Sequence, residues 1–237
     1  RWLLEPFLED TGWTVLYAEK GSAKSYLALS IACSIASGVP VFGTEPTKTG
    51  PVAYLDWEGS RREFDIRLTK LRRGMDIDVE PPVYYRFGEH SLYSSTPGLQ
   101  RRFVELGIVA CVVDSKSVAM SGAPMGEAVL EINRAIRRLG VPTLLIDHKS
   151  KAAIKGDDPD MAIGSVHTGN AARLVFSVKS VHHDGEIRQH IICTDANNGP
   201  RRHPLDVTFM FEGDTTHVLC GGMPARAETM QELPVPY

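Results

Sequence analysis

A lysine and a serine stand side by side where a short apolar run, residues 14–18, gives way to an amphipathic helical pattern. The connecting segment is Glu19-Lys20-Gly21-Ser22-Ala23-Lys24-Ser25-Tyr26. Its end matches the phosphate-loop pattern G-x-x-x-x-G-K-[ST], although alanines, Ala18 and Ala23, stand at both motif glycines. A helix N-terminus offers free N–H groups and a positive dipole to a phosphate. We therefore expect residues 19–26 to bind a nucleotide, with Lys24 at its β- and γ-phosphates and the Ser25 hydroxyl at Mg²⁺. The alternative is an ordinary strand-to-helix turn with a surface lysine.

Acidic side chains follow three other apolar runs, at the points where strands are expected to end. The segments are Asp56-Trp57-Glu58-Gly59, Val113-Asp114-Ser115 and Ile146-Asp147-His148-Lys149. In open α/β sheets, ligands bind in the crevice outside the carboxyl ends of the strands. Asp114 is expected to complete the Mg²⁺ shell with Ser25, and Glu58 to polarise a water for attack on the γ-phosphate. Each acid taken alone could equally be a solvated loop residue.

The elements that must position these groups alternate between strands and helices. Strands are expected at 14–18, 51–56, 83–87, 108–113 and 141–146, and helices at 24–37, 60–73, 97–106 and 126–139. The run 108–113 is apolar throughout and rich in β-branched residues, which is typical of a strand buried on both faces of a parallel sheet. A short helix is expected at 165–172. The last strands, at 174–179, 186–194 and 206–211, have no helices between them, so the predicted fold is α/β with a mostly parallel sheet and an antiparallel C-terminal extension.

Composition sets the limits on what this chain can be. It has 237 residues, 43% hydrophobic and 23% charged, with 26 Lys+Arg against 29 Asp+Glu. That length suits one α/β domain, expected at 1–212, followed by a loosely ordered tail at 213–237. No apolar run is long enough to span a bilayer, and no signal peptide is visible, so a cytoplasmic protein is expected. The four cysteines form no CxxC pair and are expected to be reduced, with the first three buried. The mildly acidic balance argues against bulk electrostatic binding of nucleic acid, although a local basic patch stays possible.

Taken together and in this order, these motifs resemble the RecA-like P-loop ATPase core, in particular the RepA/DnaB-like hexameric helicase branch of AAA_25 type. The resemblance covers about residues 1–212. It rests on the loop at 18–25, the acids at 56–59 and 114, and Asp147-His148-Lys149, with Ile163-Gly164-Ser165, Asn170, Arg173 and Asn197-Asn198-Gly199-Pro200 beyond them.

The resemblance implies Mg²⁺-dependent ATP hydrolysis coupled to single-stranded DNA, as in a replicative helicase motor that works as a homo-oligomer, typically a hexameric ring. Within that family Glu58 would activate water, His148 would sense the γ-phosphate, and Arg173 would reach the ATP of a neighbouring subunit. The loop after His148 would line the central channel, where Lys149, Lys151 and Lys155 would neutralise DNA phosphates.

The sequence departs from that family at two places. The alanines at both loop glycines put ATP affinity in question, and Asp195-Ala196-Asn197 stands where related chains carry Lys-x-Arg. Two other functions therefore stay open: a recombination or regulatory ATPase that does not unwind DNA, and a degenerate nucleotide-binding scaffold.

Two further clusters invite a functional interpretation. His182 and His183 are adjacent, so on a strand they face opposite sides and are poorly placed to share a metal ion. Asp184-Gly185 after them is typical of a hairpin turn. The basic residues of the helix at 60–73 are interrupted by acids, which favours a solvated helix face over a binding patch.

Overall fold

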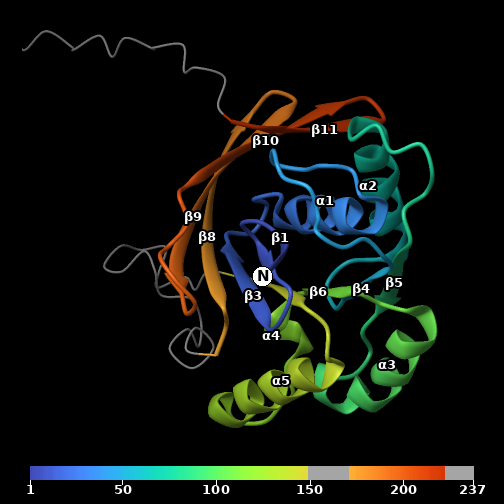
Figure 1. The fold of residues 1–237 in the computed structure, drawn as a ribbon, viewed down its shortest axis with the longest axis vertical. Coiled ribbons are helices and arrows are strands. Elements are labelled where there is room, and N and C mark those ends of the chain that lie inside the picture. Colours follow the sequence, from blue (N-terminus) through green and yellow to red (C-terminus); the bar gives the residue numbers. More distant parts are fainter. Residues whose placement is uncertain (149–170, 222–237) are drawn as a thin grey trace, which may run out of the picture.

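The computed structural model describes residues 1–148 and 171–221 (Figure 1). Nine strands form one sheet in the order β11-β10-β9-β8-β3-β7-β6-β4-β5. From β8 to β5 all neighbours are parallel, whereas β8 to β11 pair antiparallel. The predicted α/β class, with its parallel sheet and antiparallel extension, is confirmed. The strands of the sheet are β3 (Trp13–Ala18), β4 (Val52–Asp56), β5 (Val83–Phe87), β6 (Ala110–Asp114), β7 (Thr143–His148), β8 (Leu174–His183), β9 (Glu186–Ala196), β10 (Leu205–Glu212) and β11 (Thr215–Cys220).

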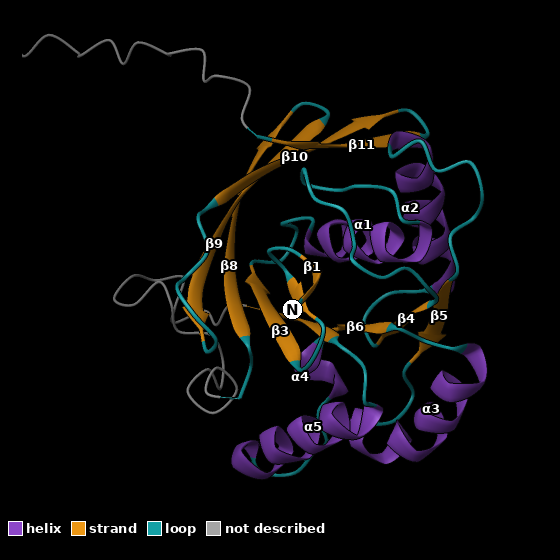
Figure 2. Ribbon diagram, viewed as in Figure 1, coloured by secondary structure: helices purple, strands orange, loops and turns teal. Residues whose placement is uncertain are grey.

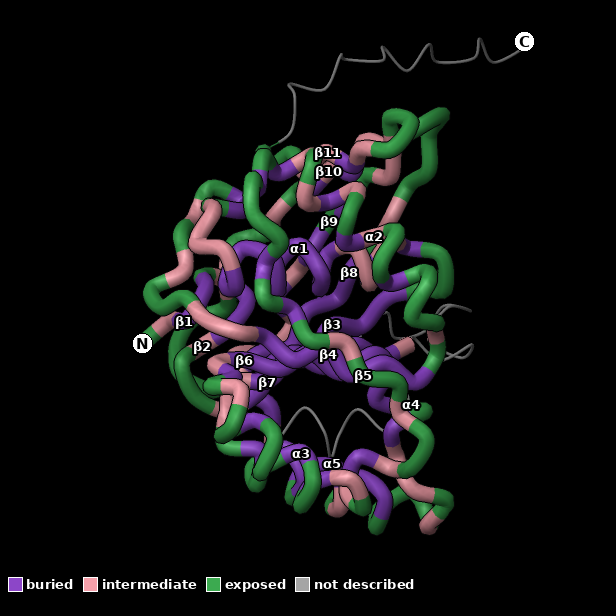
Figure 3. The backbone as a smooth tube through the Cα atoms, turned by 90° about the vertical axis from the view of Figure 1, so that its right-hand side faces the viewer, coloured by how far each residue is buried: buried purple, intermediate pink, exposed green. Residues whose placement is uncertain are grey.

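Helices cover both faces of the parallel part of the sheet (Figure 2). Helices α1 (Lys24–Ser37) and α2 (Arg61–Gly74) lie on one face, and α3 (Leu92–Leu106), α4 (Lys116–Ala119) and α5 (Met125–Leu139) lie on the other. Alternate residues of the strands point to opposite faces, so the buried side chains form two clusters. Leu16 and Ile146 belong to the cluster under α1, and Val15 and Leu145 to the cluster over α5. The central strands are buried throughout, as Figure 3 shows.

The antiparallel extension curls toward α2, and this corrects the expected domain end at residue 212. Strand β11, at 215–220, pairs along its whole length with β10 and packs against α2. A Cβ at Gly74 would lie 2.0 Å from the Thr216 carbonyl oxygen, so only glycine permits this approach. Lys70 donates to the Gly213 carbonyl at 2.7 Å, and Arg73 pairs with Asp214. The segment from residue 212 was expected to be loosely held because it contains Gly, Pro and acidic residues, whereas Gly213, at φ 56°, turns the chain so that β11 pairs with β10.

Other element boundaries also differ from the sequence expectations. Helix α3 begins at Leu92, five residues before the expected start at Pro97, because the Ser91 side chain caps it by accepting from the Ser94 N–H. The one-turn helix α4 and a small hairpin of β1 (Trp2–Leu4) and β2 (Leu8–Glu9) were not predicted. The helix expected at 165–172 falls almost entirely outside the described residues, as does the tail from 222.

Three remaining expectations concern surface and core chemistry. Cys33, Cys111 and Cys193 are buried and free, as predicted, and Cys220 is exposed. The hairpin turn at Asp184-Gly185 is confirmed, with Gly185 at φ 73° between β8 and β9. Within the described residues, no helix has the length and apolar character needed to cross a membrane.

Candidate active site

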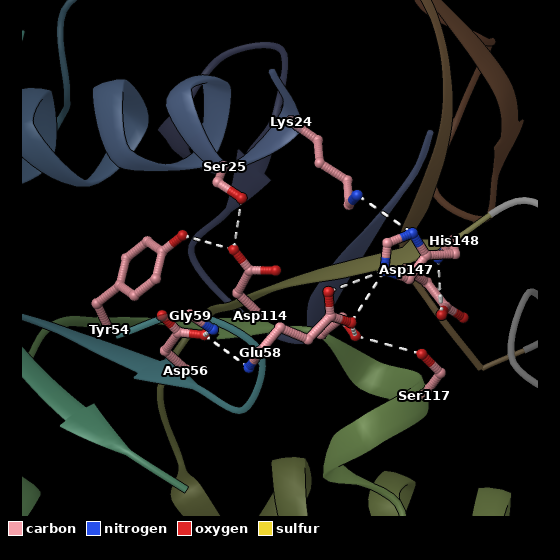
Figure 4. Close-up of polar contacts among 11 residues, drawn as sticks. Lys24, Ser25, Tyr54, Asp56, Glu58, Gly59, Asp114, Ser117, Asp147 and His148 are labelled. Atoms are coloured by element: carbon pink, nitrogen blue, oxygen red, sulfur yellow. Dashed lines mark hydrogen bonds and ion pairs between the residues drawn. The ribbon is translucent and has the colours of Figure 1, made fainter. Parts of the chain in front are cut away.

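The polar residues singled out in the sequence meet at one edge of the sheet because their strands are parallel and in register. Ala18 at the end of β3 pairs with His148 at the end of β7, and Asp56 at the end of β4 pairs with Asp114 at the end of β6. The polar side chains at these strand ends and in the loops after them therefore point toward one another (Figure 4). This is where ligands bind in open α/β sheets.

The phosphate loop leads into a helix whose N-terminus carries no cap of its own. Ala23 at the N-cap of α1 makes no side-chain capping bond, and the first turn has no acidic residue. Helix α2 differs, because Ser60 and Glu63 form a complete capping box at its start. The first N–H groups of a helix have no partner within the helix. The start of α1 is thus left for an anion, which fits a nucleotide phosphate.

The Ser25 hydroxyl donates to Asp114 Oδ2 at 2.7 Å, and the Tyr54 hydroxyl donates to the same oxygen at 2.9 Å. Asp114 is 4% exposed, and burial raises its pKa, although the hydrogen bonds from Ser25 and Tyr54 oppose that shift. A hydroxyl and a carboxylate oxygen in contact are hard oxygen ligands of the kind that Mg²⁺ takes in nucleotide sites. The donor set at Ser25 and Asp114 therefore fits Mg²⁺.

His148 bridges Lys24 and Glu58. The Lys24 ammonium lies 3.2 Å from His148 Nδ1, and His148 Nε2 lies 2.9 and 3.1 Å from the two Glu58 carboxylate oxygens. An ammonium can only donate, so Nδ1 accepts and Nε2 carries the proton that it donates to Glu58. The three residues come from α1, the loop after β4 and the end of β7. They form a continuous polar chain across the crevice (Figure 4).

The environment of this chain shifts two pKa values downward. Burial lowers the pKa of Lys24, against the opposing attraction of Asp114 and Glu58. For Glu58 burial alone would raise the pKa, but hydrogen bonds from Ser115 and His148 and the charge of Lys24 together place it below its usual value. Glu58 is therefore ionised and able to accept a hydrogen bond from a water at neutral pH.

Asp56 holds the turn from which Glu58 projects. Its Oδ1 accepts from the N–H groups of Glu58 at 2.9 Å and Gly59 at 2.8 Å. A Cβ at Gly59 would lie 2.6 Å from Asp56 Oδ2, so the turn leaves no room for a side chain there. Asp56 thus acts as a brace, and Glu58 is the acid that faces the crevice.

Three residues of the site were not among the sequence candidates. Tyr54 bonds to Asp114, the Ser115 hydroxyl donates to Glu58, and Lys116 forms a 2.7 Å ion pair with Asp147. Lys116 and Asp147 are both about fully buried, with side chains 2% and 1% exposed. A lysine directly after the Asp114-Ser115 pair was the available sequence signal, but nothing in the sequence pairs it with Asp147.

Arg173 does not lie near the phosphate loop of its own chain. It precedes β8, and its N–H bonds to the Trp13 carbonyl at the opposite edge of the sheet. Its guanidinium donates to Asn198, which in turn donates to Glu9. Gly12 leaves room for its stem, because a Cβ there would lie 2.7 Å from Arg173 Cγ.

The remaining candidates are distributed as follows. Lys149, Lys151 and Lys155 lie outside the described residues. Several basic residues of α2 are engaged by the chain itself, as in the Arg61–Asp65 pair at 2.8 Å. Across residues 1–148 and 171–221, no three His, Cys, Asp or Glu side chains are grouped so that they could hold a metal ion.

Comparison with known proteins agrees with this geometry. The fold is similar to the crystal structure of KaiC-like protein PH0186 from Pyrococcus horikoshii OT3, with a TM-score of 0.59 and 15% identity over 92% of this chain and 93% of that one. No curated protein matches the sequence. Residues 1–153 match the family model AAA_25, described as an AAA domain. The chain therefore belongs to the AAA_25 family and has a RecA-like P-loop ATPase core.

Proposed function

We propose that this chain hydrolyses Mg²⁺-ATP and couples the reaction to binding or translocation of single-stranded DNA, as the motor of a RepA/DnaB-like helicase. The observation that carries the ATPase part is the chain from Lys24 through His148 to Glu58, beside the Ser25–Asp114 pair. One arrangement supplies a cation for phosphate, an ionised carboxylate for water and oxygen ligands for a metal ion.

Each residue has a distinct task in the proposed reaction. The N–H groups of α1 and the Lys24 ammonium bind the phosphates, and Glu58 orients the attacking water by accepting its hydrogen bond. Bound Mg²⁺, held by Ser25 and Asp114, supplies positive charge at the phosphate oxygens. Because His148 contacts both Lys24 and Glu58, a phosphate that draws Lys24 away changes the partners of His148.

His148 is also the link proposed for DNA coupling. The sequence directly after it carries Lys149, Lys151 and Lys155. Lysines in that position would bind backbone phosphates without reading sequence. A change of partner at His148 is thus adjacent in the chain to the proposed DNA contacts.

The position of Arg173 supports a homo-oligomer, a hexameric ring in this proposal. The Arg173 N–H bonds to Trp13 at the start of β3, whereas the phosphate loop follows the other end of that strand, so the proposed role of Arg173 is toward ATP bound by a neighbouring subunit. Arginines that act in this way across an interface contribute about 10³ to 10⁵ in rate in GTPases.

The test measures ATP turnover with and without single-stranded DNA. Lys24→Ala and Glu58→Gln are expected to abolish turnover while the protein stays folded by circular dichroism. Glu45→Gln, an exposed carboxylate away from the crevice, serves as the matched control. Wild-type turnover in either site variant would refute the assignment.

Two rival functions predict different outcomes. Turnover that DNA stimulates, without strand displacement, would indicate a recombination or regulatory ATPase. The second rival is a degenerate nucleotide-binding scaffold. Ala23 favours it, because its left-handed backbone, φ 57°, costs free energy for a residue other than glycine and can weaken the phosphate loop. ATP binding without turnover, or no ATP binding at millimolar concentration, would support a degenerate scaffold and overturn the motor.

A further inference from the structure

A glutamine of the antiparallel extension contacts the backbone of the phosphate loop. Gln189 lies on β9, is 1% exposed, and donates from Nε2 to the Ser22 carbonyl at 2.5 Å. The two residues are 167 positions apart in the sequence. A strand that carries no residue of the site thus reaches the loop that binds phosphate.

The place of Gln189 in the core is explained by this one bond. Its face of β9 otherwise carries Ile191 and Cys193, both buried. Gln189 Oε1 has no hydrogen-bond partner among the described residues. Burial of an amide costs free energy unless the amide is hydrogen-bonded. A hydrophobic residue would therefore be more stable at this buried position, and the hydrogen bond to the Ser22 carbonyl is the interaction that favours glutamine.

The Ser22 carbonyl belongs to the peptide unit that leads into Ala23. Ala23 has φ 57° and ψ 24°, in the left-handed region. A residue other than glycine keeps such a backbone only where its surroundings enforce it. Because the peptide is planar, a bond that fixes the Ser22 carbonyl also fixes the direction of the Ala23 N–H.

We propose that Gln189 is a positioning residue that holds Ala23 in the left-handed conformation. Its hydrogen bond to the Ser22 carbonyl stabilises a backbone that a glycine at position 23 would adopt without strain. The affinity of the loop for ATP then depends on β9. This inference rests on the proposed function only in that the ligand of the loop is ATP.

The variant Gln189→Met removes the donor and keeps the volume of the side chain. Without the hydrogen bond from Gln189, the left-handed backbone of Ala23 carries the full penalty of a residue with a Cβ, and we expect a roughly tenfold weaker Kd for ATP, which corresponds to about 1.4 kcal/mol. In the Ala23→Gly background the left-handed backbone is accessible without a brace, so the same change is expected to weaken binding less than about twofold. Ile191→Met, on the same face of the same strand, is the matched control and should leave the Kd unchanged.

Two measurements on the full chain decide the inference. Fluorescent ATP titration gives the Kd of each variant, and hydrogen exchange of residues 19–25 without nucleotide reports the loop directly. The inference is supported if Gln189→Met weakens binding and speeds exchange only when Ala23 is present. Equal effects in both backgrounds, or no effect of Gln189→Met in either measurement, would overturn it.

Failure of the proposed function gives a different result. If the wild type binds no ATP, the motor assignment fails, but hydrogen exchange still decides whether Gln189 braces the loop.

Discussion

The buried ion pair beneath the site, Lys116 with Asp147, allows a quantitative test of the structure. Lys116 follows Asp114 and Ser115 directly, and Asp147 precedes His148, so the pair ties together the two segments that contact Glu58. Its atoms lie 2.7 Å apart, and its side chains are 2% and 1% exposed.

The variant Lys116→Met leaves a buried carboxylate without its cation. Breaking a buried pair in this way costs about 3–5 kcal/mol. A chain of this size loses about 2–4 °C of Tm per kcal/mol, so the expected fall is roughly 6–20 °C. The double variant Lys116→Met/Asp147→Leu removes both charges and is expected to recover most of that loss, because well-packed apolar replacements of such pairs are often neutral.

The assay is thermal and chemical denaturation, at neutral pH, of the wild type, the single variants Lys116→Met and Asp147→Leu, and the double variant. Arg102→Met, which removes one partner of the exposed Arg102–Glu105 pair, is the control and should cost less than about 1 kcal/mol. A loss below about 1 kcal/mol for Lys116→Met, or a double variant as unstable as the sum of the singles, would refute the described pairing.

Three further predictions follow from the site. Asp114→Asn should abolish Mg²⁺-dependent turnover but make the nucleotide-free protein more stable, because the carboxylate is buried. Burial raises the pKa of Asp114 above 3.8, the ordinary value of an aspartate side chain. In the wild type its stabilising contribution is therefore present below pH 3.8 and is lost as the pH rises through the folded pKa. The stability advantage of Asp114→Asn should therefore be larger at neutral pH than below pH 3.8 in denaturant melts with EDTA, and a reversed trend would contradict this burial. Arg173→Ala should slow turnover without weakening ATP binding, and adding an excess of Lys24→Ala subunits, which keep Arg173, should restore part of the rate; no recovery would argue against a role across an interface. Gly88→Ala should destabilise the fold by about 1–3 kcal/mol in melts, since its Cβ would lie 2.1 Å from the Trp57 ring; wild-type stability would contradict that contact.

The fold class and the edge of the sheet that carries the site could be predicted from local patterns. The helix at 24–37 and the strand at 83–87 were predicted at their observed bounds, because each has a clear periodicity and a clear end. Parallel strands carry their polar ends to one edge, so the acids at 56–58, 114 and 147 were expected to converge. Glu58 was preferred over Asp56 from the sequence, and the structure adds the role of Asp56, which accepts hydrogen bonds from the N–H groups of the turn.

The sequence by itself thus determined the alternation of strands and helices and the phosphate loop, including the alanines at its two glycine positions. These features depend on hydrophobic periodicity and turn residues, which are properties of neighbouring residues in the chain. Only the tertiary structure decided which distant residues support that loop and its carboxylates. Gln189 and Ser22 are 167 residues apart, and Lys116, at the start of α4 after β6, pairs with Asp147 on the neighbouring strand β7. The same holds for β11, whose short run becomes a strand because β10 and α2 are beside it. Hydrogen bonds and ion pairs of this kind depend on strand order and register, which no local pattern specifies.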